Sequence, residues 1–78
     1  MTREAIRQVV ESSAKFPVTL RLTDGRSVRI AHPDYAMFPV TATREFVVTQ
    51  PETPFRFEII ATHEVASAIL DRTPAKPQ

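Results

Sequence analysis

Two short runs of alternating apolar and polar residues flank the single glycine of this chain. Residues 18–22 and 27–30 alternate with a period of two, and Thr23-Asp24-Gly25 lies between them. A lone glycine marks a position where the backbone needs a positive φ, and Asp-Gly between alternating runs is typical of a β-hairpin. We therefore predict a hairpin with Asp24 and Gly25 in its turn.

The phase of the two runs predicts the register of this hairpin. A two-residue loop would place Leu20 opposite Arg29, whereas a three-residue loop with Gly25 in a bulge places Leu20 opposite Val28. We choose the second register because it pairs apolar with apolar residues. The predicted core face then comprises Val18, Leu20, Val28 and Ile30, and the opposite face comprises Thr19, Arg21, Ser27 and Arg29.

An amphipathic helix is expected over residues 3–14. Thr2 is a suitable N-cap, and Glu4 lies in the first turn, where the helix dipole favours an anion. Pro17 disfavours helix at the residue before it and ends the segment. The apolar stripe at helical spacing comprises Ile6, Val9, Val10 and Ser13.

Short strands follow the hairpin. Pro33 interrupts the ladder because it has no N–H to donate. The alternation of residues 55–59 predicts that Phe55, Phe57 and Ile59 point inward. The further strands are expected at residues 36–41, 45–49, 55–59 and 66–70, with a one-turn connection at 62–65.

These elements predict a single, mainly β domain over residues 1–71 and a disordered tail over 72–78. One helix followed by about five short strands indicates a strongly bent antiparallel sheet. Closure of that sheet into a small barrel would remove its exposed edges. Leu20, Leu22, Phe57 and Ile59 are expected to line its interior, with the helix as a lid.

Composition narrows the functional classes. The 78 residues include 42% hydrophobic residues and no cysteine, and ten basic against nine acidic residues give a net charge of +1. A disulfide framework and cysteine-based zinc or redox chemistry are excluded, and no apolar run approaches the roughly 20 residues of a membrane span. A cytoplasmic protein with no membrane partner is expected.

The order of motifs resembles a family of short bacterial proteins of uncharacterised function. Its members carry Asp-Gly-Arg in a hairpin, followed by His-Pro-Asp or His-Pro-Glu and an aromatic residue, as in residues 24–26 and 32–35 here. The resemblance covers roughly residues 4–70 and implies no activity.

The same layout is similar to Sm-like and SH3-like small barrels, which implies a barrel fold. The Sm-like RNA site uses an Asp-x-x-x-Asn segment and an Arg-Gly pair before the last strand. Asp34 could match the aspartate, but the asparagine and the Arg-Gly pair are missing from the corresponding segments. The resemblance therefore does not carry an RNA site to this chain.

His32, Asp34, His63 and Glu64 are the candidates for a metal or acid–base site. Such a site needs imidazole nitrogens and carboxylate oxygens that converge on one point. The alternative interpretation is a turn in which Asp34 and His32 bond to nearby backbone, and we favour it. A chain of this length would also struggle to enclose a catalytic pocket. We expect no enzymatic activity and no cofactor.

A basic stripe is the candidate nucleic-acid site. Arginines supply cations for phosphates, and an aromatic ring supplies a stacking surface for bases. The alternative is a solvated face whose arginines pair with Glu45 and Glu58 across strands. The candidate residues are Arg21, Arg29 and Arg56, with Tyr35 or Phe38 as the platform.

Self-association is the functional expectation that we favour. Val47 and Ile60 are expected to face away from the apolar sides of their strands, and strands that are apolar on both sides are normally buried on both sides. We predict a non-enzymatic binding or assembly module that associates with itself as a dimer or ring. The alternative partners are RNA, single-stranded DNA or a protein encoded in the same operon.

Overall fold

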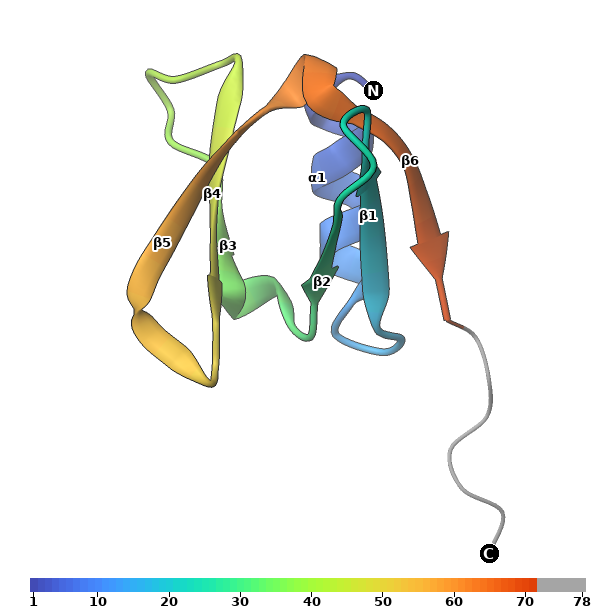
Figure 1. The fold of residues 1–78 in the computed structure, drawn as a ribbon, viewed down its shortest axis with the longest axis vertical. Helices are drawn as coiled ribbons and strands as arrows, with labels where there is room; N and C mark the ends of the chain where they lie inside the picture. Colours follow the sequence, from blue (N-terminus) through green and yellow to red (C-terminus); the bar gives the residue numbers. More distant parts are fainter. Residues whose placement is uncertain (72–78) are drawn as a thin grey trace, which may run out of the picture.

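Two three-stranded antiparallel sheets and one helix make up the computed structural model, which describes residues 1–71 (Figure 1). Helix α1 spans Arg3–Ser12. Sheet A has the order β2-β1-β6, with β1 at Val18–Leu22, β2 at Ser27–Ile30 and β6 at Val65–Leu70. Sheet B has the order β3-β4-β5, with β3 at Ala36–Met37, β4 at Glu45–Gln50 and β5 at Thr53–Ala61. Single 3₁₀ turns join the sheets: η1 (Pro33–Tyr35) precedes β3, and η2 (Thr62–Glu64) precedes β6.

The predicted hairpin is confirmed in both turn and register. Leu20 lies opposite Val28, and the Leu22 N–H donates to the Arg26 carbonyl at 2.9 Å, which leaves a three-residue loop. Gly25 has a φ of 91°, the left-handed conformation that the loop needs.

Replacing Gly25 by alanine is expected to destabilise the protein by about 1–2 kcal/mol, the cost of a left-handed backbone for an L-residue. A Cβ at this position would meet no heavy atom within 4 Å, so the cost is conformational and not steric. Gly25→Asn should lose less, because asparagine tolerates this region. Urea unfolding of the three proteins measures the difference, and equal losses for alanine and asparagine would contradict the explanation.

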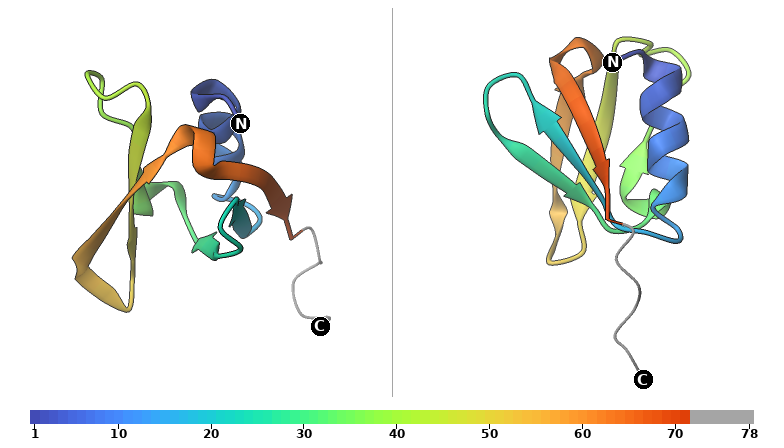
Figure 2. Two further views of the ribbon diagram at one scale, coloured as in Figure 1. Left: turned by 45° about the horizontal axis from the view of Figure 1, so that its top comes forward. Right: turned by 90° about the vertical axis from the view of Figure 1, so that its right-hand side faces the viewer.

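Helix α1 forms where predicted, although it ends at Ser12, two residues earlier than expected. The Thr2 hydroxyl caps it by accepting from the Ala5 N–H at 3.1 Å. Ile6 and Val10 are buried, and Figure 2 shows the helix as a separate layer beside the two sheets. The helix is therefore held in place by its apolar stripe.

The core lies between the sheets and beneath the helix. Phe46 is its largest fully buried side chain, and its ring stacks on Phe38 with centroids 5.3 Å apart. Leucines 20 and 22 lie inside, as predicted. The buried apolar residues are Ile6, Val10, Val18, Leu20, Leu22, Val28, Ile30, Phe46, Val48, Ile60 and Val65.

The mainly β fold with an N-terminal helix is confirmed, but the sheets do not close into one barrel. Each sheet has its own ladder. The reason is that η1 interrupts the strand that would run from β2 into β3. Pro33 occupies the first position of that turn, and a proline cannot continue a ladder. Only Ala36–Met37 of the strand expected at 36–41 remains.

The predicted orientation of β5 is wrong by one residue. Ile60 lies opposite Phe46 on β4, and residues opposite each other point to the same face. Because Phe46 is buried, Ile60 is buried too, at 3% exposure. Phe55, Phe57 and Ile59, all predicted to point inward, are instead 96%, 64% and 69% exposed.

The expected tail at residues 72–78 lies outside the described residues. Across residues 1–71, no helix has the length and apolar character needed to cross a membrane.

Candidate interaction surface

An apolar row crosses the outer face of sheet B. Met37 on β3 lies opposite Val47 on β4, and Val47 lies opposite Ile59 on β5. Phe57 occupies the next outward position of β5, opposite Thr49. Met37, Phe57 and Ile59 are each more than half exposed. We call Met37, Val47, Phe57 and Ile59 the sheet B row. As predicted, Val47 points away from the core; Ile60, predicted to do the same, does not.

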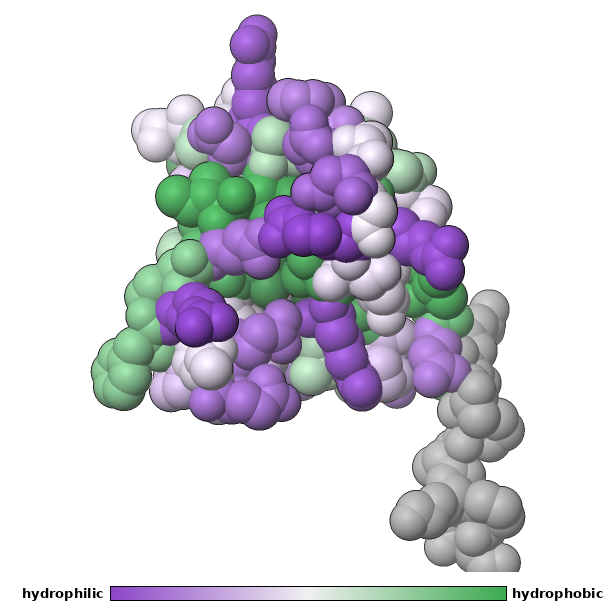
Figure 3. Space-filling view, in the orientation of Figure 1, coloured by the Kyte–Doolittle hydropathy of each residue, from purple (hydrophilic) through white to green (hydrophobic). Residues whose placement is uncertain are grey.

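A shallow hollow of about 400 Å³ lies along this row. Tyr35 of η1 borders it together with Met37, Val47 and Phe57. Phe55 lies beyond the hollow toward the start of β5 and is 96% exposed. In Figure 3, apolar residues form the left margin of the molecule over β5. The surface thus offers apolar side chains with an aromatic rim, as interaction sites often do.

The inner side of β5 is tied to sheet A by one arginine. Arg26 follows the hairpin turn and donates to the carboxylates of Glu58, at 2.6 Å, and Asp24, at 3.0 Å. Figure 3 shows hydrophilic side chains crossing the front of the space between the sheets. The backbone N–H and then the side chain of Arg26 hydrogen-bond to Asp24 and lower the pKa of its carboxyl below the ordinary 3.8. These contacts orient β5 relative to the hairpin.

This shift makes part of the stability depend on pH. Because the pKa of Asp24 is lower in the folded than in the unfolded chain, its charge stabilises the fold above pH 3.8, and the contribution is lost as the pH falls through the lowered pKa. Asp24→Asn should therefore be less stable than the wild type at pH 7 and equally stable near pH 2. Urea unfolding at both values measures this, and a difference that persists or grows in acid would contradict it.

The arginines proposed from the sequence do not form one stripe. Arg21 and Arg29 lie diagonally across β1 and β2 on the exposed face of sheet A. Arg56 belongs to β5 of sheet B, where it borders a small hollow with Glu58. Tyr35 lies on η1 beside Phe57, and Phe38 packs against the core. The two candidate aromatic platforms are thus separated from Arg21 and Arg29.

The histidines and their acidic neighbours form two separate local pairs. The Asp34 N–H donates to Nδ1 of His32 at 3.1 Å, which caps η1. Glu64 accepts from the Thr23 hydroxyl at 2.6 Å, which ties η2 to the hairpin loop. In residues 1–71, no three histidine or acidic side chains cluster as a metal site would require. The described contacts of His32 and Glu64 are those of structural turns.

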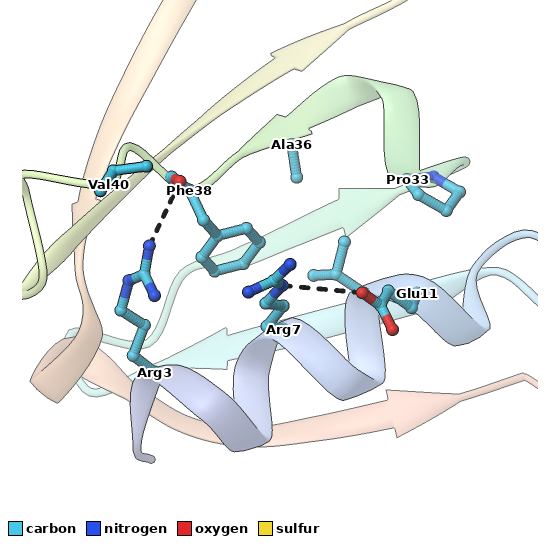
Figure 4. A pocket seen from close by; sticks show the side chains of 8 residues that line it. Arg3, Arg7, Glu11, Pro33, Ala36, Phe38 and Val40 are labelled. Carbon is cyan, nitrogen blue, oxygen red and sulfur yellow. Dashed lines mark hydrogen bonds and ion pairs between the residues drawn. The ribbon is translucent and has the colours of Figure 1, made fainter.

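A second hollow, of about 460 Å³, lies between α1 and the segment after β3 (Figure 4). The guanidinium of Arg3 donates to the carbonyls of Phe38 at 3.2 Å and Pro39 at 3.0 Å, and it lies 5.6 Å from the centre of the Phe38 ring. One turn further along the helix, Arg7 pairs with Glu11 at 3.6 Å. Arg3 thus fastens the helix to the segment after β3 through its Nη2 atom, whereas its Nε atom is buried without a hydrogen-bond partner among the described residues.

Sequence reasoning missed Met37, Phe57 and Ile59 as surface residues. No local signal gives the face of β5, because continuing the pairing from the turn at residues 51–52 would place Phe57 opposite Phe46. A register shift between Thr49 and Gln50 places Ile60 there instead.

Comparison of this chain with models of protein families, with curated proteins and with solved structures finds no match. The resemblances noted in the sequence therefore stay predictions.

Proposed function

We propose that this protein is a non-enzymatic binding and assembly module that self-associates through the β5 side of sheet B, where apolar side chains of the outer face adjoin the strand edge. The observation that supports this proposal is the sheet B row, in which Met37, Phe57 and Ile59 are exposed on the same face of one sheet. A row of large apolar side chains on a small soluble domain is typical of an interaction surface.

The size of the domain supports a second copy as the occupant. A chain of 78 residues builds a small core, and this one has no cysteine with which to form a disulfide. Small domains of this kind gain stability by oligomerisation. The exposed row also adjoins β5, an edge strand of sheet B. A second copy could therefore contribute both apolar contacts and backbone hydrogen bonds.

The non-enzymatic part of the proposal rests on the contacts of the ionisable side chains. The candidates His32 and Glu64 bond within turns or between neighbouring loops. The hollow along the sheet B row is lined mainly by apolar and aromatic side chains. This lining fits binding better than acid–base chemistry.

A matched pair of variants tests the proposal on the full chain. Sedimentation velocity across 1–200 µM protein should show the wild type shifting from monomer to a larger species. Ile59→Asp should weaken association at least about tenfold, since burial of one isoleucine contributes about 1.5–3 kcal/mol. Val40→Asp is the control, because Val40 is 89% exposed but lies outside the row, and it should associate like the wild type. A wild-type monomer at every concentration would refute the proposal.

Binding of single-stranded nucleic acid is a second candidate, supported by Arg21 and Arg29 alone. Both are exposed on one face of sheet A, and neither forms a salt bridge in the described part of the chain. If these arginines bind single-stranded nucleic acid, Arg21→Ala removes one phosphate contact. The slope of the logarithm of the binding constant against the logarithm of salt concentration should then become less steep by about one. Fluorescence anisotropy with a labelled oligonucleotide at low salt tests it, and the absence of any binding would discard it.

A further inference from the structure

Strand β5 has one unpaired edge. It is the longest strand, at nine residues, and within residues 1–71 it pairs only with β4; a register shift between Thr49 and Gln50 leaves residues 54–56 of β5 outside that ladder. Figure 1 shows it at the outer left of the molecule, with no described element beyond it. An exposed strand edge is a template for pairing with another strand.

At the other long edge strands, β2 and β6, one backbone carbonyl each already accepts a hydrogen bond from a side chain or from the N-terminus. The Gln50 amide donates to the Arg29 carbonyl on β2 at 2.8 Å. The Met1 ammonium group donates to the Val65 carbonyl at the start of β6, also at 2.8 Å. By contrast, no side chain in the described part of the chain hydrogen-bonds to the backbone of Phe57 or Ile59. The edge of β5 is therefore the most accessible one.

The backbone groups of two residues point toward this free edge. In an antiparallel ladder, opposite residues alternate between exchanging two hydrogen bonds and exchanging none. The Thr62 N–H donates to the Arg44 carbonyl at 2.8 Å, just beyond the last pair of the β4–β5 ladder. Counting back along β5 by twos, Ile60 and Glu58 bond to β4. Phe57 and Ile59 then direct their N–H and C=O groups outward.

We propose that two copies of this protein pair antiparallel through β5, in the register centred on Phe57. This inference rests on the proposed self-association and narrows its contact to the β5 edge: Phe55, Phe57 and Ile59 pair across it, whereas Val47 and Met37 lie one and two strands away. Phe57 of each copy lies opposite Phe57 of the other. With residues 54–56, which are outside the β4 ladder, extended along the new partner strand, Phe55 lies opposite Ile59 and Arg56 lies opposite Glu58. The two copies of sheet B become one six-stranded sheet, and aromatic and aliphatic residues pair on its outer face.

Charge selects this register over its neighbours. A dimer centred on residue 56 would place Arg56 opposite its own copy, and one centred on residue 58 would do the same with Glu58. Like charges directly opposite each other destabilise a sheet. The register centred on Phe57 instead forms two Arg–Glu pairs. Glu58 would then lie between Arg26 of its own chain, already 2.6 Å away, and Arg56 of the second copy.

The proposal also distinguishes a dimer from a ring. Head-to-tail pairing of β5 with β6 of another copy would produce a ring or a filament. Strand β6 has the sequence Val-Ala-Ser-Ala-Ile-Leu and no ionisable side chain, so it offers no partner for Arg56 or Glu58. A second β5 strand, by contrast, supplies a glutamate opposite Arg56 and an arginine opposite Glu58.

A mixing experiment tests the charge pairing on the full chain. Arg56→Glu alone and Glu58→Arg alone each place like charges opposite each other in the proposed dimer, and each should raise the dissociation constant about tenfold or more. An equimolar mixture should restore dimers near wild-type affinity, because both cross-strand pairs become complementary. Circular dichroism of each variant checks that it folds. Failure of the mixture to associate would overturn the register.

A cysteine trap gives an independent measurement, because the wild type contains no cysteine. In the proposed register the Cα atoms of the two Phe57 residues lie about 5.5 Å apart, within the range for a disulfide. Phe57→Cys should form covalent dimers under mild oxidation. In the control Phe55→Cys, the two sulfurs are separated by about four residues of strand, roughly 13 Å, and should not cross-link.

The outcomes separate the two proposals. A monomeric wild type refutes self-association and the register together. Association that Ile59→Asp abolishes, combined with cross-linking at position 55 and not 57, keeps self-association and refutes the register. A mass above that of a dimer refutes the two-fold arrangement in favour of a head-to-tail ring. Dimers that cross-link at position 57 and re-form on mixing support the full inference.

Discussion

Replacing Phe46 by alanine is expected to cost about 3–5 kcal/mol of folding free energy. Phe46 is fully buried, stacks on Phe38 and lies opposite buried Ile60. Domains of this size have total stabilities of about 4–12 kcal/mol, so the variant should lose about a quarter or more of its stability and unfold at a clearly lower temperature than the wild type. Thermal unfolding followed by circular dichroism measures the loss.

Phe55→Ala is the matched control for this loss. Phe55 is also an aromatic residue in sheet B, but 96% of its surface is exposed. At sub-micromolar protein, where association contributes least, its removal should change stability by no more than about 0.5 kcal/mol. Equal losses for the two variants would contradict the assignment of the inner and outer faces.

Replacing Arg3 by alanine is expected to have the second largest effect, about 1.5–3 kcal/mol. Its guanidinium bonds to two carbonyls in the segment after β3 and lies over the ring of Phe38. The substitution leaves the partly buried carbonyls of Phe38 and Pro39 without this donor. Urea unfolding should show the loss, and amide hydrogen exchange should rise in the segment that Arg3 holds.

Arg7→Ala is the control for charge and helix propensity. Arg7 lies four residues further along α1, where its pair with Glu11 is more than half exposed, and such pairs contribute about 0.3–0.5 kcal/mol. Arg3→Lys should not restore stability, because an ammonium group cannot bond to two carbonyls and stack on a ring in one geometry. Full rescue by lysine would contradict this role.

The hairpin and the helix were predictable because each depends on local signals. One glycine in the chain identifies the position of positive φ, and the phase of the flanking leucines and valines leaves one register that pairs apolar with apolar residues. Thr2 and the stripe through Ile6 and Val10 similarly specify α1. These elements need no information from distant parts of the chain.

The orientation of β5 was not predictable from its own alternation. Phe55, Phe57 and Ile59 occupy one phase, while Ile60 occupies the other, so both faces contain apolar residues. Pairing with β4 decides between them by placing Ile60 opposite buried Phe46. The same reason explains the candidate surface: Phe57 and Ile59, both expected to line the core, instead form exposed parts of the sheet B row.

Whether the strands close into one barrel depends on the path of the chain between β2 and β3, which local patterns do not determine. The sequence showed that Pro33 interrupts a strand, but not that the chain would turn through η1 and start a separate sheet. The predicted arginine stripe failed for the same reason, since Arg56 belongs to one sheet and Arg21 and Arg29 to the other.

Strand β1 lies at the centre of sheet A, between β2, which follows it directly, and β6, which ends the described fold. During synthesis on the ribosome, β1 can acquire its first neighbour early but must wait for the second until almost the whole domain has emerged. Formation of the β1–β6 ladder therefore requires closure of a long loop, which slows folding. Until then, one side of the nascent hairpin stays open to mispairing with strands of other chains.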